Sequence, residues 1–266
     1  MTETEPKTAT GLPAASSFSE RLFHGALRLA QVLALLTVLL GLIVLAGWAL
    51  HIEALKSVFP GYINMKANTA LCLVFSGASL LIGYLIRRRT WTRTCSVSLA
   101  LVAAFIAAAT LLEYLTNRSF GMDQLFIADS LDSPFTPNPG RMAPNTALAF
   151  LLFDAALLCL YRGRRGILLA HCFTLLGLFI TLLASIGYLF NAQILNSFDS
   201  LTRMAIHTTV GFWMLGIAIL CSRPKKGFLA AILANTSSGL IVRNLIAPSI
   251  VAPLVFGSAM FVAASV

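Results

Sequence analysis

The chain has 266 residues, of which 58% are hydrophobic and 11% are charged, and its formal net charge is +9. Because a soluble domain carries about 25% charged residues, this composition excludes an ordinary soluble domain and indicates a membrane protein. The basic residues stand in short clusters between apolar runs, a pattern typical of membrane topology rather than of nucleic-acid binding.

Residues 1–26 are polar, and we predict that they form a cytoplasmic tail ahead of a transmembrane domain over residues 27–266. The first apolar run is too long for the core of a secretory signal and continues to the aromatic Trp48, so we expect it to be retained. About 20 apolar residues are needed to cross a bilayer as a helix. The predicted spans are Leu29–Leu50, Thr69–Ile86, Cys95–Leu115, Asn145–Tyr161, Ile167–Phe190, Ile206–Cys221 and Leu245–Val266.

These runs lack the alternation of barrel strands, so the expected fold class is all-α: a polytopic bundle of seven transmembrane helices. The fourth and sixth spans are short, and we expect each to extend by a turn outward. The loops after spans two, four and six are rich in Lys and Arg, which places them and the amino terminus in the cytoplasm. Their basic residues are Arg87, Arg88, Arg89, Arg93, Arg162, Arg164, Arg165, Arg223, Lys225, Lys226 and Arg243. The opposite loops hold Lys56, Lys66, Arg118, Arg141 and Arg203.

Three segments of the chain align without gaps, and each opens an even-numbered span. They are Met65-Lys-Ala-Asn68-Thr69, Met142-Ala-Pro-Asn145-Thr146 and Met204-Ala-Ile-His207-Thr208. A weaker match closes the preceding spans: Trp48-Ala-Leu-His51, Tyr114-Leu-Thr-Asn117 and Tyr188-Leu-Phe-Asn191. We therefore predict three helical hairpins over roughly residues 29–89, 95–165 and 167–226, followed by a linker and final span over residues 227–266.

The repeated positions allow two interpretations. Met, Asn or His, and Thr at spacings of three and four share one helix face, and Asn or Thr near a helix start satisfies free backbone donors. The repeat is then a cap with a packing stripe. Alternatively, the polar residues form a ligand-binding ring near the outer membrane face. That ring would consist of His51, Asn117 and Asn191 with Asn68, Asn145 and His207.

Two acids lie inside predicted spans. A charged side chain at mid-membrane costs roughly 2.5–3.5 kcal/mol on insertion scales, so Asp154 must face protein or water, as a structural or a functional group. Its repeat equivalents are Gly77 and Gly216, while Glu113 lies near the outer end of the third span. We include both acids among the candidate ligand-binding residues.

A metal or haem bound between His51 and His207 is an alternative, because both histidines lie at one membrane depth. Proteins that hold haem between two histidines usually place them well inside the bilayer, so we expect no metal and no cofactor. No recognisable catalytic motif is present, and we expect no enzymatic activity from this chain.

One stretch resembles a known family. Tyr114, then Gly121-Met-Asp123-Gln-Leu125, then Pro139-Gly-Arg141-Met142-Ala-Pro-Asn145-Thr146, is similar to MASE-like multi-span amino-terminal regions of bacterial sensor proteins. The tail from Ser238 to Gly257 also resembles the stretch that leads into the last two spans of those proteins.

The resemblance implies a sensory or anchoring input module, in the bacterial inner membrane, of a histidine kinase or GGDEF diguanylate cyclase. It also implies homodimerisation through an output domain absent from this chain, which we expect to follow an eighth span. Expected partners are the lipid bilayer and a small-molecule or lipid-like ligand, and not nucleic acid. A small transporter or channel, and an intramembrane haem or redox protein, are the alternative functions.

Overall fold

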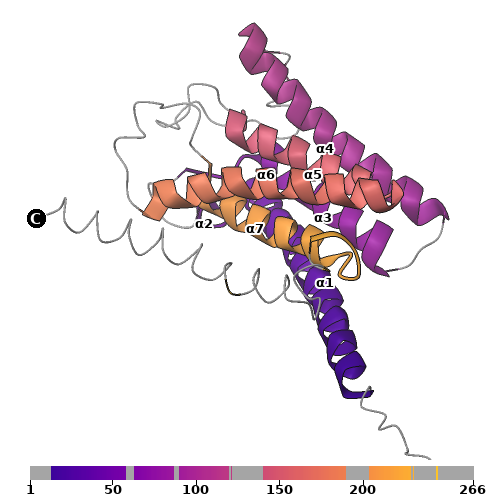
Figure 1. The fold of residues 1–266 in the computed structure, drawn as a ribbon. Helices are drawn as coiled ribbons and strands as arrows, with labels where there is room; N and C mark the ends of the chain where they lie inside the picture. The colour runs from indigo at the N-terminus through magenta and orange to yellow at the C-terminus, as the bar shows by residue number, and fades with distance from the viewer. Residues whose placement is uncertain are drawn as a thin grey trace, which may run out of the picture.

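The computed structural model describes residues 13–57, 63–86, 90–119, 121, 140–189, 204–228, 230 and 244 (Figure 1). These residues form helices and no strand, as the predicted all-α bundle requires. The helices are α1 (Pro13–Ala49), α2 (Glu53–Lys56), α3 (Ala67–Leu80), the π-helical turn η1 (Leu81–Ile86), α4 (Thr90–Thr116), α5 (Pro144–Cys159), α6 (Gly163–Leu189) and α7 (Ile206–Cys221).

Long and short helices alternate along the chain. Glu20–Ala49, Thr90–Thr116 and Gly163–Tyr188 are long and apolar enough to cross a membrane, whereas Ala67–Gly83, Pro144–Cys159 and Ile206–Cys221 are shorter apolar helices. Large apolar side chains on the long helices are exposed, for example Leu35, Phe105 and Phe179. Such surfaces are stable in lipid, so the chain is a membrane protein. The seventh predicted span, Leu245–Val266, lies outside the described residues.

The expectation that the fourth and sixth spans extend outward is wrong. Helix α5 begins at Pro144 and α7 at Ile206, and the preceding residues Ala143 and Ala205 are extended, with ψ of 149° and 148°. A residue before proline is disfavoured in the α region, which explains the start of α5. Short helices are tolerated in a membrane where surrounding protein covers them.

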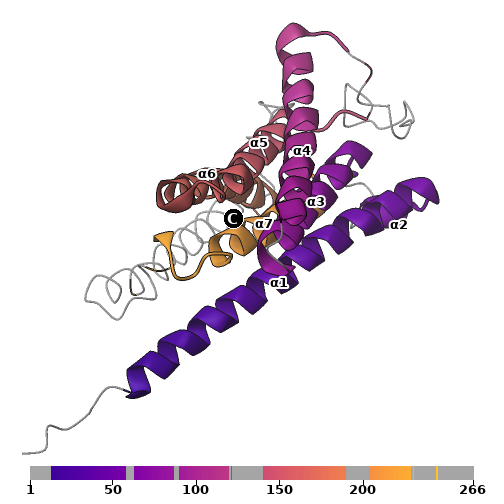
Figure 2. The same ribbon diagram turned by 90° about the vertical axis from the view of Figure 1, so that its right-hand side faces the viewer.

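The six main helices form a closed ring of contacts. Each long helix packs against two short ones: α1 against α3 and α7, α4 against α3 and α5, and α6 against α5 and α7. The three short helices also contact one another at the centre. The three hairpins therefore have an approximate threefold arrangement, with the short helices inside. The bundle includes a steep crossing, in which α4 runs across α1 (Figure 2).

Glycines allow the closest helix approaches. A Cβ on Gly77 of α3 would lie 2.9 Å from Val38 Cγ2 of α1, and one on Gly41 of α1 would lie 2.7 Å from the Ala70 carbonyl oxygen of α3. In the third hairpin, a Cβ on Gly216 would lie 2.5 Å from Leu178 Cδ2. Close contact between small residues is how helices associate in lipid, where the hydrophobic effect does not drive them together.

Candidate functional site

The two halves of the sequence repeat meet at one end of the bundle, which we call the Met end. Trp48 Nε1 donates to the Met65 carbonyl oxygen at 2.8 Å, and the Tyr114 hydroxyl donates to that of Met142 at 3.3 Å. The Tyr188 hydroxyl donates to the Met204 carbonyl oxygen in the same way. Each aromatic residue thus ties the end of a long helix to the start of the following short helix. We call these three contacts the aromatic clamps.

The repeated Asn residues bond to their own helices. Asn68 Oδ1 accepts from the backbone N–H of Thr69, and Asn145 Oδ1 accepts from that of Thr146, both at 2.8 Å. In each case the amide satisfies one of the donors left free at a helix start. The third hairpin has His207 at this position, and its Nδ1 is buried without a hydrogen-bond partner in the described part of the chain. Asn68 and Asn145 thus satisfy a first-turn donor in two hairpins, although the N-cap residues themselves are Lys66 and Ala143 and make no side-chain cap hydrogen bond. The third hairpin, with His207, lacks this contact among the described residues.

The residue eight positions after each repeated Met faces the centre of the bundle. The rings of Phe150 and Phe212 meet edge to face with centroids 4.7 Å apart, and a Cβ on Gly211 would lie 2.7 Å from Leu73 Cδ1. Leu73, Phe150 and Phe212 are equivalent in the repeat. We call them the aromatic layer, because two of the three are phenylalanine.

The repeated threonines lie one helical turn nearer the Met end, on the same face of each short helix as the aromatic layer. Thr69, Thr146 and Thr208 are all buried, with 3%, 3% and 1% of their surface exposed. We call these three residues the threonine layer. It places three hydroxyl-bearing side chains inside the bundle, at a level where helix packing alone would accept valine.

Asp154 lies on the other side of the aromatic layer from the threonines. Its side chain is fully buried, and its Oδ1 accepts a hydrogen bond of 2.8 Å from Ser76 Oγ on α3. Its Oδ2 is buried without a hydrogen-bond partner among the described residues. Cys72, also on α3, is fully buried, and its thiol contacts the Ala103 carbonyl oxygen at 3.8 Å. The second hairpin therefore contacts the first in the interior through the hydrogen bond between Ser76 and Asp154.

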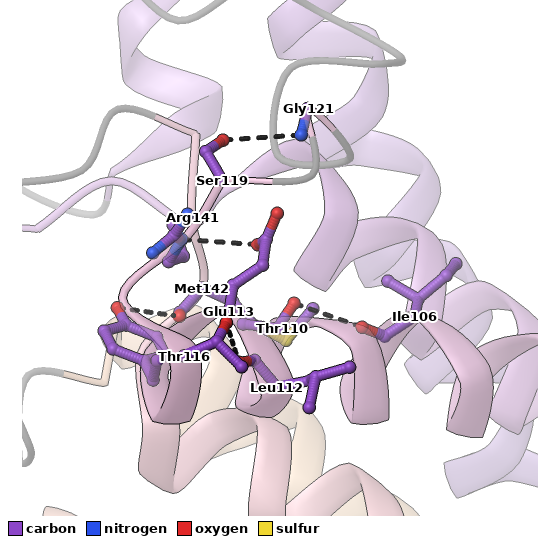
Figure 3. Close-up of polar contacts among 10 residues, drawn as sticks. Ile106, Thr110, Leu112, Glu113, Thr116, Ser119, Gly121, Arg141 and Met142 are labelled. Atoms are coloured by element: carbon purple, nitrogen blue, oxygen red, sulfur yellow. Dashed lines mark hydrogen bonds and ion pairs between the residues drawn. The ribbon is translucent and has the colours of Figure 1, made fainter.

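Glu113 is also fully buried, but it lies beside a clamp rather than in the stack of layers. Its Oε2 is 3.4 Å from Nε of Arg141, whose side chain is only 6% exposed (Figure 3). The Arg141 guanidinium lies over the Tyr114 ring, 5.2 Å from its centroid. Lys56 has a similar place in the first hairpin, 4.4 Å above the Trp48 ring. In both hairpins a buried cation covers the clamp aromatic.

Two predicted ring members lie away from these layers. His51 and Asn117 are exposed and have φ of 55° and 51°, the left-handed conformation that commonly ends a helix. They follow α1 and α4 at equivalent positions, while Asn191 lies outside the described residues. The structure therefore does not bring His51 together with His207 in the interior. The described ranges contain no group of three or more His, Cys, Asp or Glu that could hold a metal ion.

The residues predicted from the sequence to bind a ligand are Asn, His, Asp and Glu. The threonine layer, Ser76 and Arg141 were not predicted to take part in the site. The threonines were recognised only as part of the repeat, and Ser76 and Arg141 were not proposed as partners of the buried acids. The spacing of four residues between the threonine and aromatic layers was visible in the sequence. Which face of each short helix points to the centre was not.

Comparison with protein-family models, with curated proteins and with solved structures finds no match.

Proposed function

We propose that this chain is the membrane-embedded sensory or anchoring input module of a bacterial signal-transduction protein. In this proposal it lies in the inner membrane with its amino terminus in the cytoplasm and acts on a cytoplasmic output domain. The observation that carries the proposal is the stack of layers in the interior. Polar side chains occur at two levels of the three-helix centre, where packing alone favours apolar ones.

A stack of this kind suits a ligand that enters from the Met end. A small polar or lipid-like ligand would meet the threonine layer first, with the part-buried His207 beside it. The aromatic layer would form the floor of the site. Since every long helix packs on two short helices, a ligand that separates the short helices displaces the whole ring. Differential binding to two arrangements of one bundle is what a sensor requires.

The distribution of charge supports the orientation. At the Met end, the described cations Lys56, Lys66, Arg118 and Arg141 are accompanied by the acids Glu53 and Glu113. At the opposite end, which we call the Arg end, Glu20 is the one acid among the described residues near many basic ones. Excess Lys and Arg marks the cytoplasmic side, so in this proposal the Met end lies at the extracytoplasmic face of the membrane.

The test removes hydroxyl groups from the threonine layer without changing side-chain shape. In the natural gene with its output module, Thr146→Val and Thr208→Val should alter kinase or cyclase output at equal membrane abundance. The matched control is Thr174→Val, because Thr174 is fully buried in α6 but donates only to its own helix, to the Ala170 carbonyl oxygen at 2.7 Å. If kinase or cyclase activity is the same in the native protein and in all three variants, the threonine layer is not the ligand-binding site.

The alternative functions are decided by separate measurements. The three hairpins enter the membrane in the same sense, whereas the repeats of many transporters are inverted. Substrate flux into proteoliposomes would replace the sensor proposal with a transporter or channel. A Soret absorbance band in the purified protein would favour a haem protein instead.

A further inference from the structure

At the Arg end, four arginines from two neighbouring parts of the bundle form one exposed surface, which we call the basic corner. Arg93 lies in the first turns of α4, Arg162 follows α5, and Arg164 and Arg165 begin α6. The Arg93 guanidinium lies over the ring of Tyr161, 5.2 Å from its centroid, and joins the two parts. All four arginines are exposed. Among the described residues, no acid forms an ion pair with any of them.

The backbone adds positive charge at this corner. Helices α4 and α6 both begin here, and neither has an acidic residue in its first turn. A helix start carries a partial positive charge that Asp or Glu usually balances. Here arginines occupy those first turns, so the corner repels cations and attracts an anion from outside the chain.

The surface next to the arginines is apolar, and this identifies the chemical class of the anion. Trp91 is 59% exposed two residues before Arg93, and Leu168 is 59% exposed just after Arg165. A soluble anion would satisfy the arginines and leave Trp91 and Leu168 in water. An anionic phospholipid satisfies both, because its phosphate meets the guanidinium groups and its acyl chains cover the apolar side chains. Tryptophan is enriched at this depth of a membrane.

We propose that the basic corner is a binding site for the headgroup of an anionic phospholipid. Arginine pairs well with phosphate because its planar guanidinium presents several donors at once. The site is independent of the proposed sensory function, because the basic corner would meet lipid headgroups whatever the activity of the protein. It is also independent of orientation, since it requires only that the Arg end lies at a membrane surface.

The test measures by native mass spectrometry which lipid stays bound to the protein. The whole chain is purified from a mixture of phosphatidylglycerol and phosphatidylcholine, and the native protein is compared with its arginine variants. The native protein should retain phosphatidylglycerol preferentially. Removing one basic residue near an anionic surface costs about fivefold in binding, so R164Q/R165Q should lose about 25-fold. Arg164→Lys, which keeps the charge, should lose only a few-fold. Arg118→Gln, an exposed arginine at the Met end, should leave retention unchanged.

Three outcomes overturn the proposal. Equal retention of the two lipids by the native protein removes the preference itself. An undiminished preference in both R164Q/R165Q and a variant with all four arginines changed to glutamine places the lipid elsewhere. Full displacement of the lipid by inorganic phosphate makes the corner a general phosphate site rather than a lipid site. Circular dichroism of each variant shows that the helices are intact, and the double variant serves if the fourfold one does not fold.

Discussion

Removal of the Glu113 carboxylate should destabilise the bundle more than most single substitutions. Glu113 is fully buried in α4, and the Arg141 side chain that it pairs with is 6% exposed, so neither charge is well solvated. Breaking a buried ion pair from one side costs about 3–5 kcal/mol, because the remaining charge stays buried. For a chain of this size we expect Glu113→Ala to lower the unfolding temperature by on the order of 10 °C.

The measurement is thermal unfolding of the purified protein in detergent, followed by circular dichroism, with Arg141→Met and the double variant Glu113→Leu/Arg141→Met beside it. Because the double variant leaves no buried charge from this pair, it should be more stable than the sum of the single losses predicts. Glu20→Ala is the control for an acid outside the interior, since Glu20 is exposed and substitutions at exposed positions usually change stability by less than about 0.5 kcal/mol. Simple additivity of the two single losses would refute the reasoning.

Two more predictions concern the interior. Gly77→Leu should lower the free energy of unfolding by at least about 1–3 kcal/mol in the same unfolding assay. The reason is that even the added Cβ would lie 2.9 Å from Val38 Cγ2 of α1. Gly25→Leu is its control, with nothing within 4 Å of the added Cβ, and equal effects of the two would contradict close α1–α3 packing. Asp154→Asn should be tolerated, since its amide oxygen can still accept from Ser76, whereas Asp154→Leu should lose about 1–3 kcal/mol by leaving the Ser76 hydroxyl without its acceptor. A larger loss in the asparagine variant than in the leucine variant would show that this hydrogen bond is not what Asp154 contributes.

The positions of the six main helices in the described part of the chain could be predicted from the sequence to within a few residues, except for the start of α1 and the expected extra turns of α5 and α7. Hydropathy locates the stretch that crosses the membrane, and α1 begins earlier, at Pro13, with a mixed segment that includes Ser16, Glu20 and Arg21. The short helices α5 and α7 begin where the chain before them is extended. The clamps hold that extended chain at the Met142 and Met204 carbonyls, and a contact between residues 28 or 16 positions apart is not visible in local hydropathy.

The candidate site could be predicted only as a set of residue types. Spacing placed Asn68 and Asn145 on one face of each helix, but it could not show that their amide oxygens bond to the next backbone N–H. The pairing of Glu113 with Arg141 spans a long connection and depends on how the second hairpin closes. The assignment of the centre required one contact between helices, the edge-to-face meeting of Phe150 and Phe212. Once that contact is known, the threonine layer follows from helix periodicity alone.

The level twelve residues after each repeated Met shows where the threefold arrangement ends. Gly77 and Gly216 stand there in the first and third hairpins, each pressed against the long helix of its own hairpin. Asp154 stands there in the second, and it bonds instead to Ser76 on the short helix of another hairpin. Two of the three hairpins pack at this level without a polar group, so packing does not require one. A buried acid is costly in a membrane. Because packing does not require Asp154, its contact between α3 and α5 is the feature of the repeat that most favours a functional role.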